Sequence, residues 1–272
     1  MDITPTLFII IAVIALICEY TDASIGMGYG TALSPILIIM GFMPLHVVPA
    51  VLLGQLVGGL VGGFFHHRLG NVVLDFGQDR AIKKRLRGLG YIPKSLDSKV
   101  IFTLAICGII GALAAVVFTI NIPAMILKIY IGVMVLVIGI FILIRRNREH
   151  SFSWKGLVAI GLISAFNKGT SGGGYGPLVT GGQLMTGRDA RSSVGSTTIA
   201  EVAVCIVAFV GYVILKGDIY WTLAAATSVG SVVAAPFAAM TVKKVNKRSL
   251  KFAIGVVTCV LGVMTLAKTF IF

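Results

Sequence analysis

Ser24-Ile-Gly-Met-Gly-Tyr-Gly30 and Thr170-Ser-Gly-Gly-Gly-Tyr-Gly176 are two copies of one glycine-rich motif, 146 residues apart (24 to 170). Apolar sequence lies on both sides of each copy. Glycine costs about 1 kcal/mol relative to alanine at a helical position, so a run of three or four weakens a helix severely. Each motif therefore predicts a break between two apolar helices.

The composition around these motifs is that of a membrane protein. Of 272 residues, 57% are hydrophobic and 12% are charged, whereas a soluble domain carries about 25% charged residues. Stretches such as Ile101–Ile120 and Ile129–Ile144 are apolar on every face. A membrane β-barrel would instead alternate apolar and polar residues. We therefore expect an all-α polytopic membrane protein in the lipid bilayer.

The two motifs belong to a longer internal repeat. The offset of 146 also pairs Gln55 with Glu201, and a second block, Leu127–Gly132, resembles Leu250–Gly255 at an offset of 123. One insertion, the basic loop 66–98, accounts for the change of offset. We expect residues 1–150 and 151–272 to be two transmembrane repeats of one integral membrane domain. The predicted helical segments are Ile3–Cys18, Thr31–Phe42, Val47–Phe65, Val100–Thr119 and Ala124–Ile144, then Gly156–Phe166, Pro177–Met185, Ser193–Leu215, Ile219–Met240 and Leu250–Phe270.

The short segment after each motif is below the roughly 20 residues that cross a bilayer. With the short segments counted separately, the chain has about five helical segments per repeat and ten in total. With each short segment merged with the helix before its break, it has eight. The breaks then lie near the membrane midplane.

The positive charges predict the orientation of the chain. The net charge of +13 could suggest nucleic acid as a partner, but the cations sit at the ends of the apolar segments. Cations retain loops on the cytoplasmic side. The basic loops 66–98, 145–148 and 243–248 are therefore expected inside the cell, with the N-terminus outside a cell (inner) membrane. The charge bias swaps between the halves, as inverted repeats require. Within the first loop, Arg80–Arg87 is either a short basic helix on anionic lipid or a solvated topology signal.

The breaks are the predicted binding site. Backbone polar groups cannot stay unpaired in hydrocarbon, and a helix that starts at a break presents free N–H groups suited to a small anion. Close helix packing is the alternative interpretation, which we adopt for Gly54, Gly58 and Gly62. The predicted substrate-binding residues are Ser24, Gly26, Met27, Gly28, Tyr29, Gly30, Thr31, Asn167, Lys168, Thr170, Ser171, Gly172, Gly173, Gly174, Tyr175, Gly176 and Thr197.

Ionisable and polar residues accompany the breaks. Glu19, Asp22, Gln55, Lys168 and Glu201 lie within or beside apolar segments, and such groups usually line pathways. We expect these residues other than Lys168 to take part in proton coupling. Lys168, the repeat equivalent of Asp22, either attracts the anion or neutralises a buried carboxylate. No metal-ligand or catalytic constellation occurs in the apolar segments, so we expect neither an enzyme nor a metal or cofactor.

Three sequences together resemble a known family: Asp22–Gly30, Asn167–Gly176 and Gly195-Ser-Thr-Thr198. The chain is similar over nearly its whole length to the sulfite exporter (TauE/SafE) transporter family, although Met27 stands where the family often has a third consecutive glycine. The resemblance implies an inner-membrane carrier that exports sulfite, thiosulfate or a sulfonate, with proton coupling often proposed.

The predicted function is thus a secondary transporter of a small sulfur oxyanion that works by alternating access. The alternative is a cation channel, because Gly28-Tyr-Gly30 and Gly174-Tyr-Gly176 are similar to potassium-channel filters. Filters need several loops that point the same way, which inverted halves do not supply. The expected partners are the oxyanion and the bilayer, with no nucleic acid; a homodimer is the oligomer considered.

Overall fold

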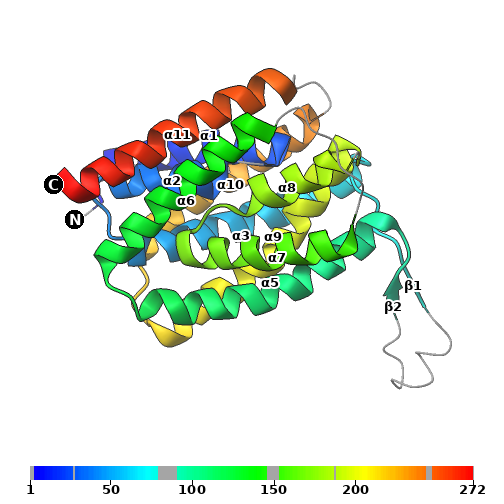
Figure 1. Ribbon diagram of the computed structural model, residues 1–272, viewed down its shortest axis with the longest axis horizontal. Coiled ribbons are helices and arrows are strands. Elements are labelled where there is room, and N and C mark those ends of the chain that lie inside the picture. The colour runs from blue at the N-terminus through cyan, green and yellow to red at the C-terminus, as the bar shows by residue number, and fades with distance from the viewer. Residues whose placement is uncertain are drawn as a thin grey trace.

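The computed structural model describes residues 3–26, 28–78, 91–145, 153–186, 188–242 and 247–271. Within these residues it has ten α-helices and one two-stranded hairpin (Figure 1). The helices are α1 Pro5–Ile25, α2 Tyr29–Ile39, α3 Pro44–Arg68, α5 Leu96–Ile120, α6 Ala124–Arg145, α7 Trp154–Ser171, α8 Tyr175–Met185, α9 Ala190–Leu215, α10 Trp221–Thr241 and α11 Lys247–Ile271. The all-α prediction and its ten segments are confirmed.

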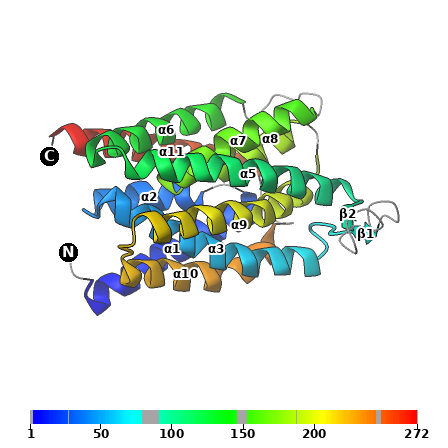
Figure 2. The ribbon, with the colours of Figure 1, turned by 90° about the horizontal axis from the view of Figure 1, so that it is seen from below.

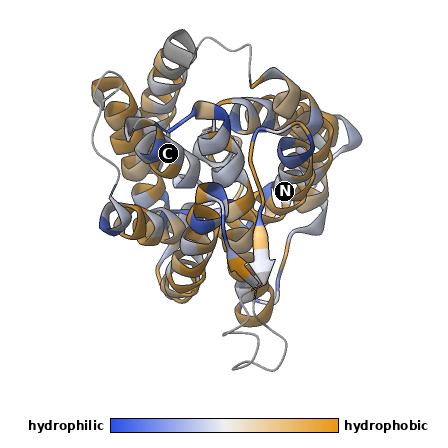
Figure 3. Cartoon of the chain, turned by 90° about the vertical axis from the view of Figure 1, so that its right-hand side faces the viewer, coloured by the Kyte–Doolittle hydropathy of each residue, from blue (hydrophilic) through white to orange (hydrophobic). Residues whose placement is uncertain are grey.

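Six of these helices are long and apolar enough to cross a membrane, with mean hydropathies of 1.6 to 2.8. Large apolar side chains point outward along them; Ile110 is 59% exposed, Ile214 73% and Phe237 60%. Seen along the bundle, hydrophobic residues colour the outermost helices (Figure 3). Such a surface is stable against lipid and would aggregate in water, so the molecule is a multi-pass membrane protein.

Each glycine motif is a short interruption between two helices. Gly26, with φ of 80°, ends α1, and Gly172, with φ of 76°, ends α7. Gly28 and Gly174, also at positive φ, precede α2 and α8. Only glycine takes these conformations without strain. The breaks are therefore shorter than the motifs, because the neighbouring motif residues belong to the last or first helical turn. Met27 lies outside the described residues.

The first basic loop is also shorter than predicted. Helix α3 continues to Arg68 and α5 begins at Leu96, and between them β1 (Phe76–Gln78) pairs antiparallel with β2 (Tyr91–Pro93). The sequence did not predict this hairpin. Residues 79–90, which include Arg80–Arg87, lie outside the described part, as do residues 146–152 and 243–246 of the other basic loops.

The two halves interlock through exchanged helices. Helix α1 packs mainly on α10 of the other half, and its repeat equivalent α7 packs mainly on α5. Two further pairs, α3 with α9 and α6 with α11, each join two equivalent helices. This pattern is unchanged when the halves are swapped, so it describes an approximate two-fold relation between them.

Equivalent helices run in opposite directions along the bundle (Figures 1 and 2). Both chain termini lie at one end, here called the termini end, and β1 and β2 lie at the other, the hairpin end. Helix α2 returns toward the termini end, where α3 begins, whereas α8 returns toward the hairpin end, where α9 begins.

Candidate functional site

The two glycine breaks contact each other in the interior of the bundle. A Cβ atom added to Gly30 would lie 1.6 Å from the carbonyl oxygen of Gly172, and one added to Gly176 would lie 2.6 Å from that of Gly26. The repeat offset converts the first contact into the second. A Cβ atom on Gly173 would in turn lie 2.6 Å from the backbone of Gly30. Backbones at this separation leave no room for side chains, which explains the glycines.

Helices α2 and α8 therefore begin next to each other and run apart. The amides of a first helical turn have no partner within the helix, and the N-terminal end carries partial positive charge. Two such ends meet at the breaks. Some of their amides are already bonded: Tyr29 N–H donates to Asp22 Oδ1 (3.3 Å) and Gly174 N–H donates to Thr31 Oγ1 (3.1 Å).

A buried polar chain lies against the breaks. Lys168 Nζ is 2.7 Å from Glu201 Oε1 and donates to Gln55 Oε1 at 3.3 Å. Gln55 Nε2 then donates to Asp22 Oδ2 at 3.0 Å. The four residues are at most 5% exposed. Because Asp22 is equivalent to Lys168 and Gln55 to Glu201, the Asp22–Gln55 contact is the counterpart of the Lys168–Glu201 ion pair, and the Lys168–Gln55 bond links them.

Glu19 is the exception in this cluster. It is fully buried, and neither carboxylate oxygen has a hydrogen-bond partner of ordinary geometry among the described residues. Gly58 borders it, since a Cβ atom there would lie 3.1 Å from Glu19 Oε1 and 2.0 Å from Ser231 Oγ. Glu19 therefore differs chemically from Asp22 and Glu201, which have partners.

The other predicted residues divide into three groups. Tyr29 and Tyr175 are fully buried, and Tyr29 Oη donates to the Thr227 carbonyl (3.3 Å) beside Gly54. Ser24 and Ser171 bond back to their own helices, and Thr170 Oγ1 has no partner in the described chain. Asn167 accepts from Tyr130 Oη at 2.5 Å. The side chains of these residues surround the breaks without joining the polar chain.

Gly54 and Gly58 have the packing role predicted for them, because Cβ atoms at these positions would meet Tyr29, Thr227 and Ser231. A groove of about 550 Å³ between α6, α7 and α8 is lined almost entirely by apolar side chains and reaches the breaks at Asn167. Among the described residues, no cluster of three or more His, Cys, Asp or Glu side chains could hold a metal ion.

A second polar set lies between the first break and the hairpin end. We call it the hairpin-end set: Thr180, Gln183, Arg188, Ser196, Thr197 and Asp97. The sequence indicated only two of its members, Thr197 and Ser196 of the Gly195–Thr198 motif. Arg188 bonds both Gln183 and Asp97. Burial lowers the pKa of the Arg188 guanidinium, and the Asp97 carboxylate opposes that shift. The spacing of Thr180 and Gln183, three apart in a short apolar helix, was the available signal.

Comparisons with known proteins indicate a membrane transporter. The family profile "Sulfite exporter TauE/SafE" matches residues 87–265. The chain is 27% identical to the "Probable membrane transporter protein YtnM" of Bacillus subtilis (strain 168) over 275 residues, which covers 97% of this chain and 84% of that protein. No solved structure matches. With most of its length matched by the profile, this chain belongs to the sulfite exporter TauE/SafE family of membrane transporters.

Proposed function

We propose that the chain carries a small sulfur oxyanion, such as sulfite, thiosulfate or an organosulfonate, by alternating access at the paired breaks. The observation that carries the proposal is Lys168, a buried cation that is linked through Gln55 and Asp22 to the N-terminus of α2, where that of α8 also begins. A cation and two helix N-termini together attract an anion inside a low-dielectric bundle. The family supports the class of substrate.

The ion pair suggests how protons couple to the anion. At rest Glu201 holds Lys168 at 2.7 Å, so an incoming oxyanion competes with that carboxylate. If Glu201 takes up a proton, Lys168 is freed and the anion replaces the lost negative charge. One proton and one anionic charge then enter the site together. Asp22 keeps its bonds from Gln55 and Tyr29 N–H throughout.

Glu19 is the competing proton carrier. The groups that face it are Cys18 and Asp22 from its own helix, Tyr29, Lys168, Glu201 and Ser231. Our proposal predicts that Glu201→Gln still binds the anion but loses the dependence of transport on a pH gradient. Glu19→Gln should keep that dependence; the reverse result would transfer the role to Glu19.

The anion site is tested on purified protein in detergent and in liposomes. Thermal stabilisation and uptake are measured with sulfite, thiosulfate, sulfoacetate and sulfate. Lys168→Ala should abolish the response to the preferred anion while the protein still elutes as a folded species. Gly173→Leu should abolish it as well and also impair folding, because its Cβ atom would lie 2.6 Å from the backbone of Gly30. If both variants transport normally, the site is wrong. Potassium flux that is insensitive to these anions would instead favour the channel.

We also propose that the hairpin end faces the cytoplasm. Described cations at that end include Arg68, Lys94, Lys99 and Arg191, and the basic sequences 80–87 and 243–248 connect helices whose ends lie there. Cytoplasmic loops are enriched in such residues. This orientation in the membrane determines which compartment the hairpin-end set faces.

A further inference from the structure

The two ends of the bundle differ in chemistry although the repeats are equivalent. Thr180 lies at the first break, where a Cβ atom on Gly26 would be 2.3 Å from its hydroxyl oxygen. Its repeat equivalent, Ser34, lies in the same way at Gly172. Beyond these two residues, equivalent positions in the two repeats differ in polarity. Gln183, Arg188, Ser196 and Thr197 correspond, at the offset of 146, to Leu37, Phe42, Ala50 and Val51.

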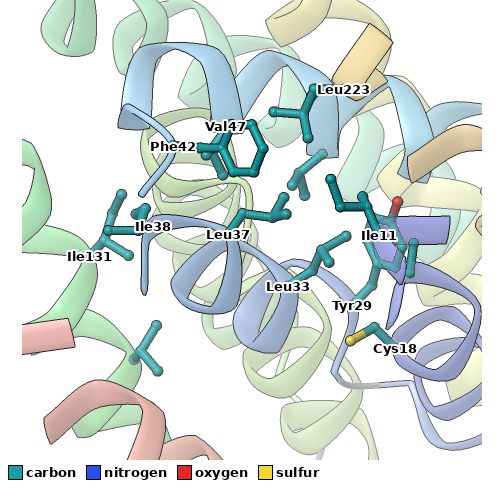
Figure 4. Close-up of a cluster of buried hydrophobic side chains, with 14 of the residues drawn as sticks. Ile11, Cys18, Tyr29, Leu33, Leu37, Ile38, Phe42, Val47, Ile131 and Leu223 are labelled. Carbon is teal, nitrogen blue, oxygen red and sulfur yellow. The ribbon is translucent and has the colours of Figure 1, made fainter. Parts of the chain in front are cut away.

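Toward the termini end, the route from the breaks is closed by apolar side chains. Leu33, Leu37, Phe42 and Val47 are at most 4% exposed and belong to one core cluster. Figure 4 shows them with Tyr29 and Leu223 filling the space between helices. An oxyanion cannot cross such a layer without losing its hydration and gaining no donor in return.

Toward the hairpin end, a chain of buried polar side chains continues from Thr180. Thr180 Oγ1 donates to Thr197 Oγ1 (2.9 Å), and Gln183 Nε2 donates to the same oxygen (3.0 Å). Ser196 Oγ donates to Gln183 Oε1 (2.9 Å). Arg188 follows, with 7% of its side chain exposed. This series of hydroxyl, amide and guanidinium donors extends from Gly26 to the hairpin end.

We propose that Arg188 is a second anion-binding residue, occupied by the transported oxyanion between the hairpin end and the breaks. This inference rests on the proposed function. A guanidinium offers a planar fork of donors that fits an oxyanion through two bonds. In the structure Asp97 binds the Arg188 guanidinium, and Val73 N–H in turn donates to Asp97 Oδ2 at 2.9 Å. The anion replaces Asp97 on Arg188 and then moves to Lys168.

The opposing interpretation is mechanical. Arg188 precedes α9 and Asp97 is in the first turn of α5, so the ion pair could simply fasten these elements together. A swap of the two charges separates the interpretations. Asp97→Arg with Arg188→Asp restores an ion pair but puts a carboxylate beside Gln183. A fastening role survives the swap, whereas anion binding does not.

The experiment measures sulfite and thiosulfate uptake into liposomes, together with thermal stability. Arg188→Gln should raise KM on the order of 10- to 100-fold, the usual effect of losing a charged hydrogen bond. The swapped variant should regain thermal stability but keep the raised KM. Lys216→Gln is the matched control, since Lys216 caps the other end of α9 beside Asp218, and its KM should stay unchanged.

A swapped variant with wild-type KM would overturn the role of Arg188 and leave the central site intact. Stabilisation of Arg188→Gln by the anion in detergent should persist, because Lys168 is still present; its loss would also overturn the two-step route. If wild-type protein neither binds nor carries sulfite, thiosulfate or sulfoacetate, the proposed function itself fails, and this inference fails with it.

Discussion

Replacing both members of the Lys168–Glu201 pair separates an anion-binding lysine from one that only neutralises a carboxylate. The variants are Lys168→Gln, Glu201→Gln and the double substitution. Glutamine keeps polar atoms near those of both native side chains. Gln55, the neighbour of Lys168 at 3.3 Å, can bond an amide as well as an ammonium.

The magnitudes follow from burial. Both side chains are at most 4% exposed, so loss of one partner leaves an uncompensated buried charge. Breaking a buried pair in this way costs about 3–5 kcal/mol, whereas replacing both charges is often close to neutral. Lys168→Gln should show the full cost. Glu201→Gln should cost less, because Asp22 still acts electrostatically on Lys168. The double variant should recover most of the loss.

The assay is thermal unfolding in detergent with and without the preferred anion. At 100 times Kd, a ligand stabilises the folded state by about 2.7 kcal/mol. We expect this stabilisation in the wild type and in Glu201→Gln, and its absence in the double variant despite recovered stability. A double variant that responds like the wild type would show that Lys168 only neutralises Glu201. A double variant as unstable as Lys168→Gln would refute the treatment of the pair as one unit.

Three further predictions concern packing, polar burial and orientation. Gly30→Ala should destabilise the protein by about 1–3 kcal/mol or more, the cost of overpacking, because its Cβ atom would lie 1.6 Å from the Gly172 oxygen. Gly181→Ala is the control: its Cβ atom would meet nothing within 4 Å, so the thermal stability should not change. Asn71→Ala should cost about 1–3 kcal/mol, since Asn71 Nδ2 donates to the Ala239 carbonyl at 2.9 Å; an unchanged melting temperature would contradict this. Alkaline phosphatase fused at the C-terminus should be active, and green fluorescent protein inserted at 80–87 should fluoresce; the opposite pattern would invert the proposed topology.

The repeat offset predicted which polar residues are equivalent, and these residues form equivalent contacts. Asp22 with Gln55 and Lys168 with Glu201 illustrate this directly. Hydrophobic length predicted the helices because crossing a bilayer fixes their minimum extent. The predicted ends of these helices were less accurate. Ser24, which bonds back to its own helix, and Thr170 are still helical, and each helix ends only at a glycine with positive φ.

Helix partners could not be predicted from the sequence. Between apolar helices, close approach depends on where small residues face each other, not on periodicity. Gly230 of α10 lies against Ala12 of α1, where a Cβ atom would be 2.1 Å from the Ala12 oxygen. Nothing in the repeat offset indicates that contact. The Arg188–Asp97 pair of the hairpin-end set was missed for a related reason, because the two residues lie 91 positions apart.

Each of α5 and α10 packs against the first helix of the other half, and this has a consequence for biogenesis. Helix α1 leaves the ribosome well before α10, the helix that covers it and places Ser231 beside Glu19, because α10 is made more than 200 residues later. At a synthesis rate of about 5–20 residues per second, that delay is on the order of 10–40 s. During this time the Glu19 carboxyl group lies in α1 without the helix that later covers it. An insertase or chaperone that shelters early segments should therefore matter more for this chain than for a bundle assembled from sequential neighbours.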